Sequence, residues 1–135
     1  GIPLDPDLIQ TGDYSSKTGF ACAQRLLNLS DPPTAIFASN DQSATGAIKA
    51  VLEAGLHVPD DISVVGFDNV PEAAYAHPRL TTVDQSIDKM GYIATEMLIS
   101  LIEGDALESD LYKGPTRLVV RDSCRAVAGH RAALH

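Results

Sequence analysis

The amino-acid sequence predicts an α/β fold built around a parallel sheet. The apolar run Ile62–Phe67 is long enough for a strand and too short for a buried helix. Its near-continuous apolarity is typical of a central parallel strand that is covered on both faces. A second short apolar run, Thr34–Ala38, precedes it, and the helical pattern between the two ends at Gly55, where a left-handed C′ residue is expected. Residues 34–67 therefore predict one βαβ unit.

Five further elements are predicted from hydrophobic spacing and from helix-capping signals. They are a short strand at Leu8–Thr11, an amphipathic helix at Lys17–Leu29, a strand at Leu80–Val83, a long helix that Ser86 caps and that ends near Glu103, and a last strand at Thr116–Val120. Pro71–Pro78 is predicted to be a loop, and Ala126–His135 has no regular pattern.

The charge and hydropathy of the chain argue against two classes of function. The 135 residues carry 10 Lys and Arg against 18 Asp and Glu, a net charge of −8. A contact with DNA or RNA needs clustered basic residues, so this segment is not expected to make one. No run approaches the roughly 20 apolar residues that span a bilayer. The chain begins at Gly1 without a signal-peptide pattern, and we expect it to be a piece of a longer protein.

No residue pattern indicates catalysis or metal binding. Motifs of serine hydrolases, P-loop proteins, dinucleotide-binding enzymes and zinc proteases are absent from the sequence. The four histidines fall in predicted loops or in the tail, so we expect no catalytic residue, no metal site and no cofactor. Cys22 and Cys124 lack metal or redox spacing and are expected to be free thiols, with a disulfide as the minor alternative. Free thiols favour a reducing compartment.

Polar side chains stand where the predicted strands end. Asp68 directly follows Ile62–Phe67, Asn40 follows Thr34–Ala38, and Gln85 lies just past Leu80–Val83. In open α/β sheets, ligands bind outside the carboxyl ends of the strands. Amide and carboxylate groups of this kind suit sugar hydroxyls, and Tyr14 is a candidate for an aromatic face against the sugar ring.

A structural explanation of the same residues stays open at this level, since they also suit helix caps and turns. Either Asn40 or Asp41 can cap the following helix, and Asp41 is predicted to do so with its side chain.

A set of short motifs resembles the LacI/GalR family of bacterial transcription regulators over residues 12–123. The motifs are Pro33-Thr34-Ala35-Ile36-Phe37, Asn40-Asp41, Ala44-x-Gly46-Ala47, Gly55-Leu56-x-Val58-Pro59, Asp61-Ile62-Ser63-Val64-Val65-Gly66-Phe67-Asp68, Pro78-x-Leu80-Thr81-Thr82-Val83 and Leu118-Val119-x-Arg121-x-Ser123. Each is weak alone, but their common register makes the resemblance specific.

The resemblance implies a periplasmic-binding-protein-like fold of type I, a three-layer sandwich around a parallel sheet. Residues 1–123 would be part of an effector-binding core. Within it, residues 1–83 and 116–123 would form the C-terminal subdomain, and residues 84–104 would be a crossover and a helix of the N-terminal subdomain. Residues 124–135 would be a tail. With most of the N-terminal subdomain absent, the apolar stripe of the helix is expected to pair with a second copy, to swap between chains or to repack on this segment.

The resemblance also implies a function and a site. Tyr14, Asn40, Asp68 and Gln85 match positions that contact effector in the family, and the effector would be a sugar or a nucleoside-like molecule. Operator DNA would be bound through a helix-turn-helix headpiece outside this segment, by a cytoplasmic homodimer without membrane contact. The alternative is a periplasmic sugar-binding protein of an ABC transporter, which shares the fold. An enzyme on a related fold is a more distant possibility.

Overall fold

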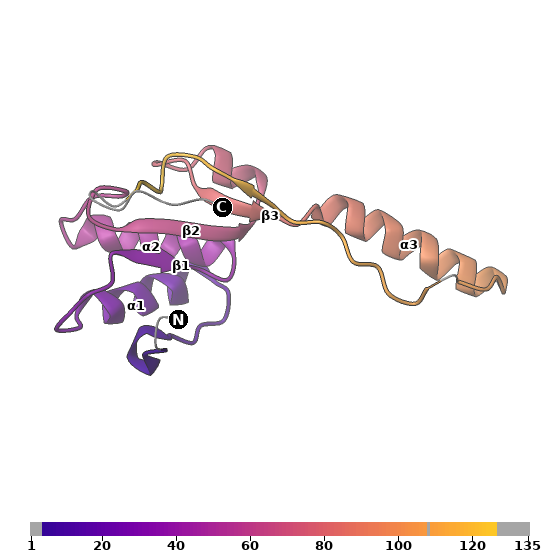
Figure 1. Ribbon diagram of the computed structural model, residues 1–135, viewed down its shortest axis with the longest axis horizontal. Helices are drawn as coiled ribbons and strands as arrows, with labels where there is room; N and C mark the ends of the chain where they lie inside the picture. The colour runs from indigo at the N-terminus through magenta and orange to yellow at the C-terminus, as the bar shows by residue number, and fades with distance from the viewer. Residues whose placement is uncertain (1–3, 108, 127–135) are drawn as a thin grey trace.

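The computed structural model describes residues 4–107 and 109–126, and it contains one four-stranded sheet in the order β1-β2-β3-β4 (Figure 1). The strands are β1 at Ala35–Phe37, β2 at Ser63–Asp68, β3 at Thr81–Asp84 and β4 at Arg117–Val119. The helices are α1 at Ser16–Leu27, α2 at Asp41–Glu53 and α3 at Ile87–Glu103, with short 3₁₀ turns η1 at Pro6–Leu8 and η2 at Pro71–Ala74. The α/β class predicted from the sequence is confirmed.

Three of the four strands run parallel, and this pairing brings their carboxyl ends to one edge of the sheet. β1 pairs with β2, β2 pairs with β3, and Asp68 lies opposite Asp84 in the register of the second pair. β4 returns antiparallel to β3, with Arg117 opposite Asp84. The predicted βαβ unit is therefore present as β1-α2-β2.

One predicted strand is wrong. Residues 8–11 belong to no strand, and Leu8 is the last residue of the 3₁₀ turn η1. The local signals explain the turn, because the Asp5 side chain accepts a hydrogen bond from the backbone N–H of Asp7 and Pro6 stands at the first position. A strand also needs a neighbour, and in the described residues no strand pairs with residues 8–11.

The core lies between one face of the sheet and the helices α1 and α2. It is made of small and branched side chains: Ala23 and Leu26 of α1, Ile36 and Ala38 at β1, Ala44, Ala47, Ile48, Ala50 and Val51 of α2, and Ile62, Val64, Ala73 and Leu80. On the opposite face, Phe37 is 66% exposed and Leu118 is 56% exposed. Within the described ranges, helices therefore cover one face of the sheet, which leaves apolar surface on the other.

Two glycines set the distance between α1 and α2. A Cβ added at Gly46 would collide with the backbone of Ser16 and Phe20 in α1. A Cβ added at Gly19 would collide with the backbone of Ser43 in α2. The two helix backbones therefore touch directly, which explains why small residues occupy this part of the core.

The long helix α3 projects away from the sheet and from α1 and α2, and it buries none of its residues (Figure 1). Its apolar side chains include Leu98, Leu101 and Ile102, all more than half exposed. Repacking of this stripe onto the sheet is therefore not seen in the described residues. Ser86 occupies the N-cap position of α3, as predicted, but it has φ 54° and its side chain makes no capping hydrogen bond. Asp84 instead accepts a hydrogen bond from the Ser86 backbone N–H at 2.8 Å.

The segment after β4 is attached to the opposite end of β2. Ser123 is fully buried, and its hydroxyl donates to the Val64 carbonyl at 2.6 Å. Arg125 donates to the carbonyl oxygen of Asp60 at 2.5 Å.

Cys22 and Cys124 are free thiols, each half-buried. The predicted irregular tail at Ala126–His135 lies outside the described residues except for Ala126. None of the helices that the structure describes has both the length and the apolarity to cross a membrane.

Replacing Gly46 by Ala should lower the free energy of unfolding by about 1–3 kcal/mol, because the added methyl group meets rigid backbone of α1. Urea denaturation of the variant and of the wild type measures the difference. Gln42→Ala, on an exposed position of the same helix, serves as the control and should change stability by less than about 0.5 kcal/mol. Equal stability of Gly46→Ala and wild type would contradict the close contact between the helices.

Candidate functional site

The candidate site lies at the edge where β1, β2 and β3 end. Asp68 is the last residue of β2, Asn40 follows β1 by three residues, and Gln85 directly follows β3. Because the three strands are parallel neighbours, their ends meet at this edge, as the sequence predicts. All three side chains are partly exposed there.

Asn40 performs two structural tasks. Its side-chain oxygen accepts a hydrogen bond from the Ser43 backbone N–H at 2.9 Å and thereby caps α2. Its amide nitrogen donates to the Tyr14 carbonyl at 3.0 Å. This bond connects the turn before α1 to the start of α2, and it joins two of the predicted site residues.

Tyr14 stands in a strained turn with its ring in solvent. Its φ is 67°, which is unusual for a residue with a side chain, and the residue is 64% exposed. The ring is therefore accessible at the same edge as Asn40. An exposed aromatic face of this kind suits the apolar side of a sugar ring.

Asp68 and Gln85 contact each other directly. The Gln85 side-chain amide donates to one carboxylate oxygen of Asp68 at 2.5 Å. The other carboxylate oxygen makes no bond within the described residues, and it is free to accept from a ligand. The pair therefore presents one amide and one carboxylate side by side, which suits two adjacent hydroxyl groups.

Two cavities border the candidate residues. One, of about 470 Å³, is lined by Asp68, Asn69, Val70, Pro71, Asp84, Ser86, Ile87, Asp88 and Lys89. It lies between the carboxyl end of β2 and the start of α3. Its lining combines polar side chains, among them Asp68 and Asp84, with the apolar side chains of Val70, Pro71 and Ile87. A mixed lining with a few placed polar groups is usual for a small-molecule site.

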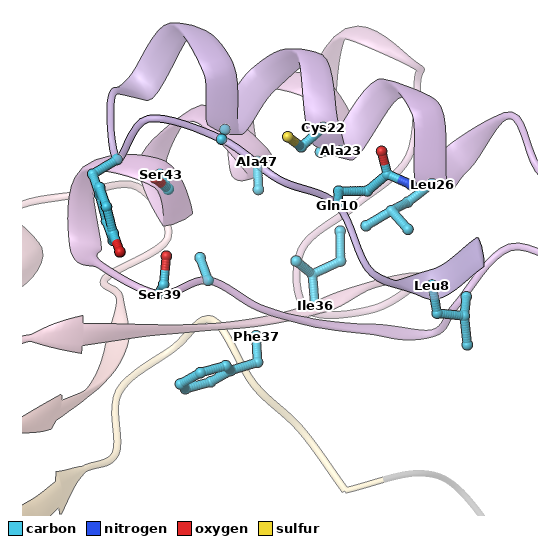
Figure 2. A pocket seen from close by; sticks show the side chains of 14 residues that line it. Leu8, Gln10, Cys22, Ala23, Leu26, Ile36, Phe37, Ser39, Ser43 and Ala47 are labelled. Atoms are coloured by element: carbon cyan, nitrogen blue, oxygen red, sulfur yellow. The ribbon is translucent and has the colours of Figure 1, made fainter. Parts of the chain in front are cut away.

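The second cavity, of about 190 Å³, lies between the N-terminal segment, α1 and β1 (Figure 2). Tyr14 borders it, but most of its lining is apolar. In Figure 2, Ile36 points toward α1 and Phe37 points away from it, which shows the alternation of β1 side chains between the two faces. Tyr14 and Asp68 therefore border different cavities, and the structure brings together Asn40 with Tyr14 and Asp68 with Gln85.

The predicted role of Asp41 as a helix cap is wrong, because Asn40 is the N-cap of α2. Asp41 is only 2% exposed, and its carboxylate forms hydrogen bonds with residues outside α2. One oxygen accepts from the Val70 backbone N–H at 2.9 Å, and the other accepts from the Thr82 hydroxyl at 2.5 Å. Burial raises the pKa of Asp41, and the negative charge of Asp68 raises it further, whereas the two hydrogen bonds lower it.

Three residues around this carboxylate were not predicted from the sequence: Thr82, Asn69 and Arg121. Thr82 is fully buried in β3, and Arg121 donates to the Asn69 side-chain oxygen at 2.7 Å. Two consecutive threonines in a predicted buried strand are a signal that buried hydroxyls have partners nearby. The partners themselves come from α2 and from the chain after β4, which one sequence does not place.

Comparison with known proteins identifies the family. Residues 1–124 match the model of the periplasmic binding protein-like domain. The chain is 41% identical over 124 residues to the probable HTH-type transcriptional repressor ExuR of Bacillus subtilis, a match that covers 92% of this chain and 37% of that protein. The chain belongs to the LacI-type branch of the periplasmic-binding-protein-like domain family.

Solved structures of LacI-type regulators superimpose on this chain. The CelR–cellobiose complex matches with a TM-score of 0.85 at 31% identity, over 90% of this chain and 37% of that one. The lac repressor dimer bound to operator matches with a TM-score of 0.75 at 38% identity, over 85% and 40%. These relatives are regulators, which are not enzymes, and they do not support the transporter alternative. This LacI-type chain spans little more than a third of the curated relatives it matches.

Asn40→Ala should lower the free energy of unfolding by about 1 kcal/mol, because the first turn of α2 loses its cap. Asn40→Ser keeps a capping oxygen and should retain most of that stability. Urea denaturation of both variants checks the prediction. Equal losses in the two variants would show that the Tyr14 contact, and not the cap, carries the effect.

Asp41 should make stability depend on pH in a recognisable direction. Its pKa is raised in the folded state, so between the ordinary value of 3.8 and the raised value the folded chain holds a proton that the unfolded chain has released. The contribution of Asp41 to the free energy of unfolding therefore increases as the pH falls through this window. Urea denaturation between pH 7 and pH 4 should show the wild type gaining stability relative to Asp41→Asn.

Asp61 supplies the control of opposite sign. The backbone N–H of His57 lowers its pKa, so its contribution to stability is present above the ordinary value and is lost as the pH falls through the lowered one. The wild type should accordingly lose stability relative to Asp61→Asn on acidification. A pH-independent difference between wild type and Asp41→Asn would contradict the raised pKa of Asp41.

Proposed function

We propose that this chain is part of the effector-binding core of a LacI-type transcription regulator and that the effector is a sugar or a nucleoside-like molecule. The observation that carries the proposal is the meeting of Asn40, Asp68 and Gln85 at one edge of a parallel sheet. The similarity to CelR, which was solved in complex with cellobiose, supports a sugar. The exposed Tyr14 ring supports it further, since sugars stack on aromatic faces.

The proposed recognition is a division of tasks among the four residues. Asp68 accepts hydrogen bonds from ligand hydroxyls with its free oxygen, and Gln85 orients the carboxylate through its 2.5 Å bond. Asn40 fixes the Tyr14 turn through the Tyr14 carbonyl and leaves the ring free to cover the ligand. The site binds without catalysis, and no metal or cofactor takes part in the proposal.

The proposed mechanism is a population shift between two arrangements of the complete protein. Residues 84–104, including α3, belong to the N-terminal subdomain in this proposal, and residues 1–83 and 116–123 belong to the C-terminal one. The exposed apolar stripe of α3 supports this division, because an apolar helix face of this size is normally buried against another part of the protein. Effector between the subdomains favours the closed arrangement and thereby changes the affinity of a homodimer for operator DNA.

DNA binding is proposed to reside outside this segment, in the cytoplasm. The segment itself has a net charge of −8, which disfavours binding to the phosphate backbone of DNA. The operator-bound lac repressor dimer supports a paired, DNA-binding protein.

Replacing Asp68 by Asn in the intact protein should weaken effector binding about tenfold or more, because a charge-assisted hydrogen bond is lost. A thermal-shift screen with a panel of sugars and nucleosides, cellobiose included, selects the ligand, and isothermal titration calorimetry measures its affinity. Asp61→Asn is the matched control, since Asp61 lies in the turn before β2 and Asp68 ends that strand. Unchanged affinity in Asp68→Asn would remove Asp68 from the site.

A further inference from the structure

The turn that carries Asp68 has a strained backbone. Asp68 has φ 113° and Asn69 has φ 57°, and neither residue is a glycine. Two consecutive positive φ values persist only where the surrounding structure holds them. The turn therefore depends on its hydrogen-bond partners.

Two buried side chains from different elements hold the backbone of this turn. The carboxylate of Asp41, at the start of α2, accepts from the Val70 N–H at 2.9 Å. The hydroxyl of Thr82, in β3, accepts from the Asn69 N–H at 3.3 Å and donates to Asp41 at 2.5 Å. The two side chains thus form one connected network under the turn.

A third group holds the turn from its other side. Arg121 donates to the Asn69 side-chain oxygen at 2.7 Å and, with a second guanidinium nitrogen, to the Leu80 carbonyl at 2.7 Å. The side chain of Asn69 is thereby fixed to the start of β3, as its backbone is fixed to Thr82. The residue after Asp68 has little freedom to move.

Burying the Asp41 carboxylate is energetically unfavourable, and the fold provides space for it. Asp41 is 2% exposed, and no basic side chain among the described residues forms an ion pair with it. Burial of an unpaired carboxylate is unfavourable. A Cβ at Gly66 would collide with one of its oxygens, so β2 carries the one residue type that admits the carboxylate. An uncharged side chain would be less costly to bury here than a carboxylate. The carboxylate is explained by its two donors, the Val70 N–H and the Thr82 hydroxyl, which both need an acceptor.

We propose that Asp41 and Thr82 are positioning residues for Asp68: together they lock the turn at residues 68–70 so that the Asp68 carboxylate stays oriented toward Gln85 and the ligand. The effect on ligand binding rests on the proposed function, whereas the locking of the turn does not. The locked turn is the binding-competent state, and loss of the lock lowers the fraction of protein in that state. Affinity then falls by the same fraction, although neither residue touches the ligand.

The first test uses the ligand-free intact protein. Thr82→Val removes the hydroxyl and keeps the shape of the side chain, whereas Thr82→Ser keeps the hydroxyl. Hydrogen exchange of the Asn69 and Val70 amides, followed by NMR, should accelerate about tenfold or more in Thr82→Val and stay within about threefold of wild type in Thr82→Ser. Unchanged exchange in Thr82→Val would overturn the proposed lock.

Ser123→Ala is the control for a merely structural effect. Ser123 is also fully buried, and it bonds Val64 and Thr81 near the starts of β2 and β3, at the end opposite Asp68. The variant should lower Tm without changing exchange at Asn69 and Val70. Acceleration as large as that of Thr82→Val would mean that general destabilisation explains the result, which would overturn the proposal.

The second test measures affinity by calorimetry, with the sugar or nucleoside that raises the wild-type Tm most in the thermal-shift panel. Thr82→Val should raise Kd about tenfold, in proportion to the lost fraction of locked protein, and Thr82→Ser and Ser123→Ala should leave it near the wild-type value. Faster exchange with unchanged Kd would overturn the link between the turn and the site. If Asp68→Asn also leaves Kd unchanged, the proposed function fails instead, while the exchange result still decides whether the lock exists.

Discussion

Parallel pairing of β1, β2 and β3 is the constraint on which the rest of this structure depends. Parallel neighbours end at the same edge, so every connection that leaves those ends emerges side by side. The chain uses this edge three times, for the start of α2, for the turn after β2 and for the crossover into α3. Asn40, Asp68 and Gln85 lie along one edge of the sheet because of this pairing, although 45 residue positions separate the first from the last.

The edge is polar on its surface and is supported by a polar network beneath. The Asp68–Gln85 pair faces outward, while Asp41 and Thr82 are buried below the turn. Buried polar groups are tolerated when their hydrogen bonds are satisfied, and no buried side-chain nitrogen or oxygen of the described residues lacks a partner. In the proposed site, this support would keep the entropic cost of ordering the edge low when a ligand binds.

Much of the fold could be predicted from the sequence, because local patterns determine it. The apolar run at Ile62–Phe67 stops at the carboxylate of Asp68, and β2 ends there. The strand β1 and the helix α2 lie where the spacing of apolar residues and the helix-ending Gly55 predict them. Two of the failures depend on partners distant in the chain, whereas Ser86 fails to cap α3 for a local reason, its positive φ. Residues 8–11 have no strand beside them in the described part of the chain, and Asp41 bonds Val70 and Thr82 across the sheet edge instead of capping its own helix.

A crystal structure of the intact protein, with the ligand selected by the sugar and nucleoside panel, would decide whether this sheet edge is the binding site. We expect ligand hydroxyls within hydrogen-bond distance of the free carboxylate oxygen of Asp68, and residues 68–70 in the same strained backbone conformation. A ligand bound elsewhere, for example in the apolar cavity beside Cys22, with Asp68 and Gln85 contacting only each other, would contradict the proposed site.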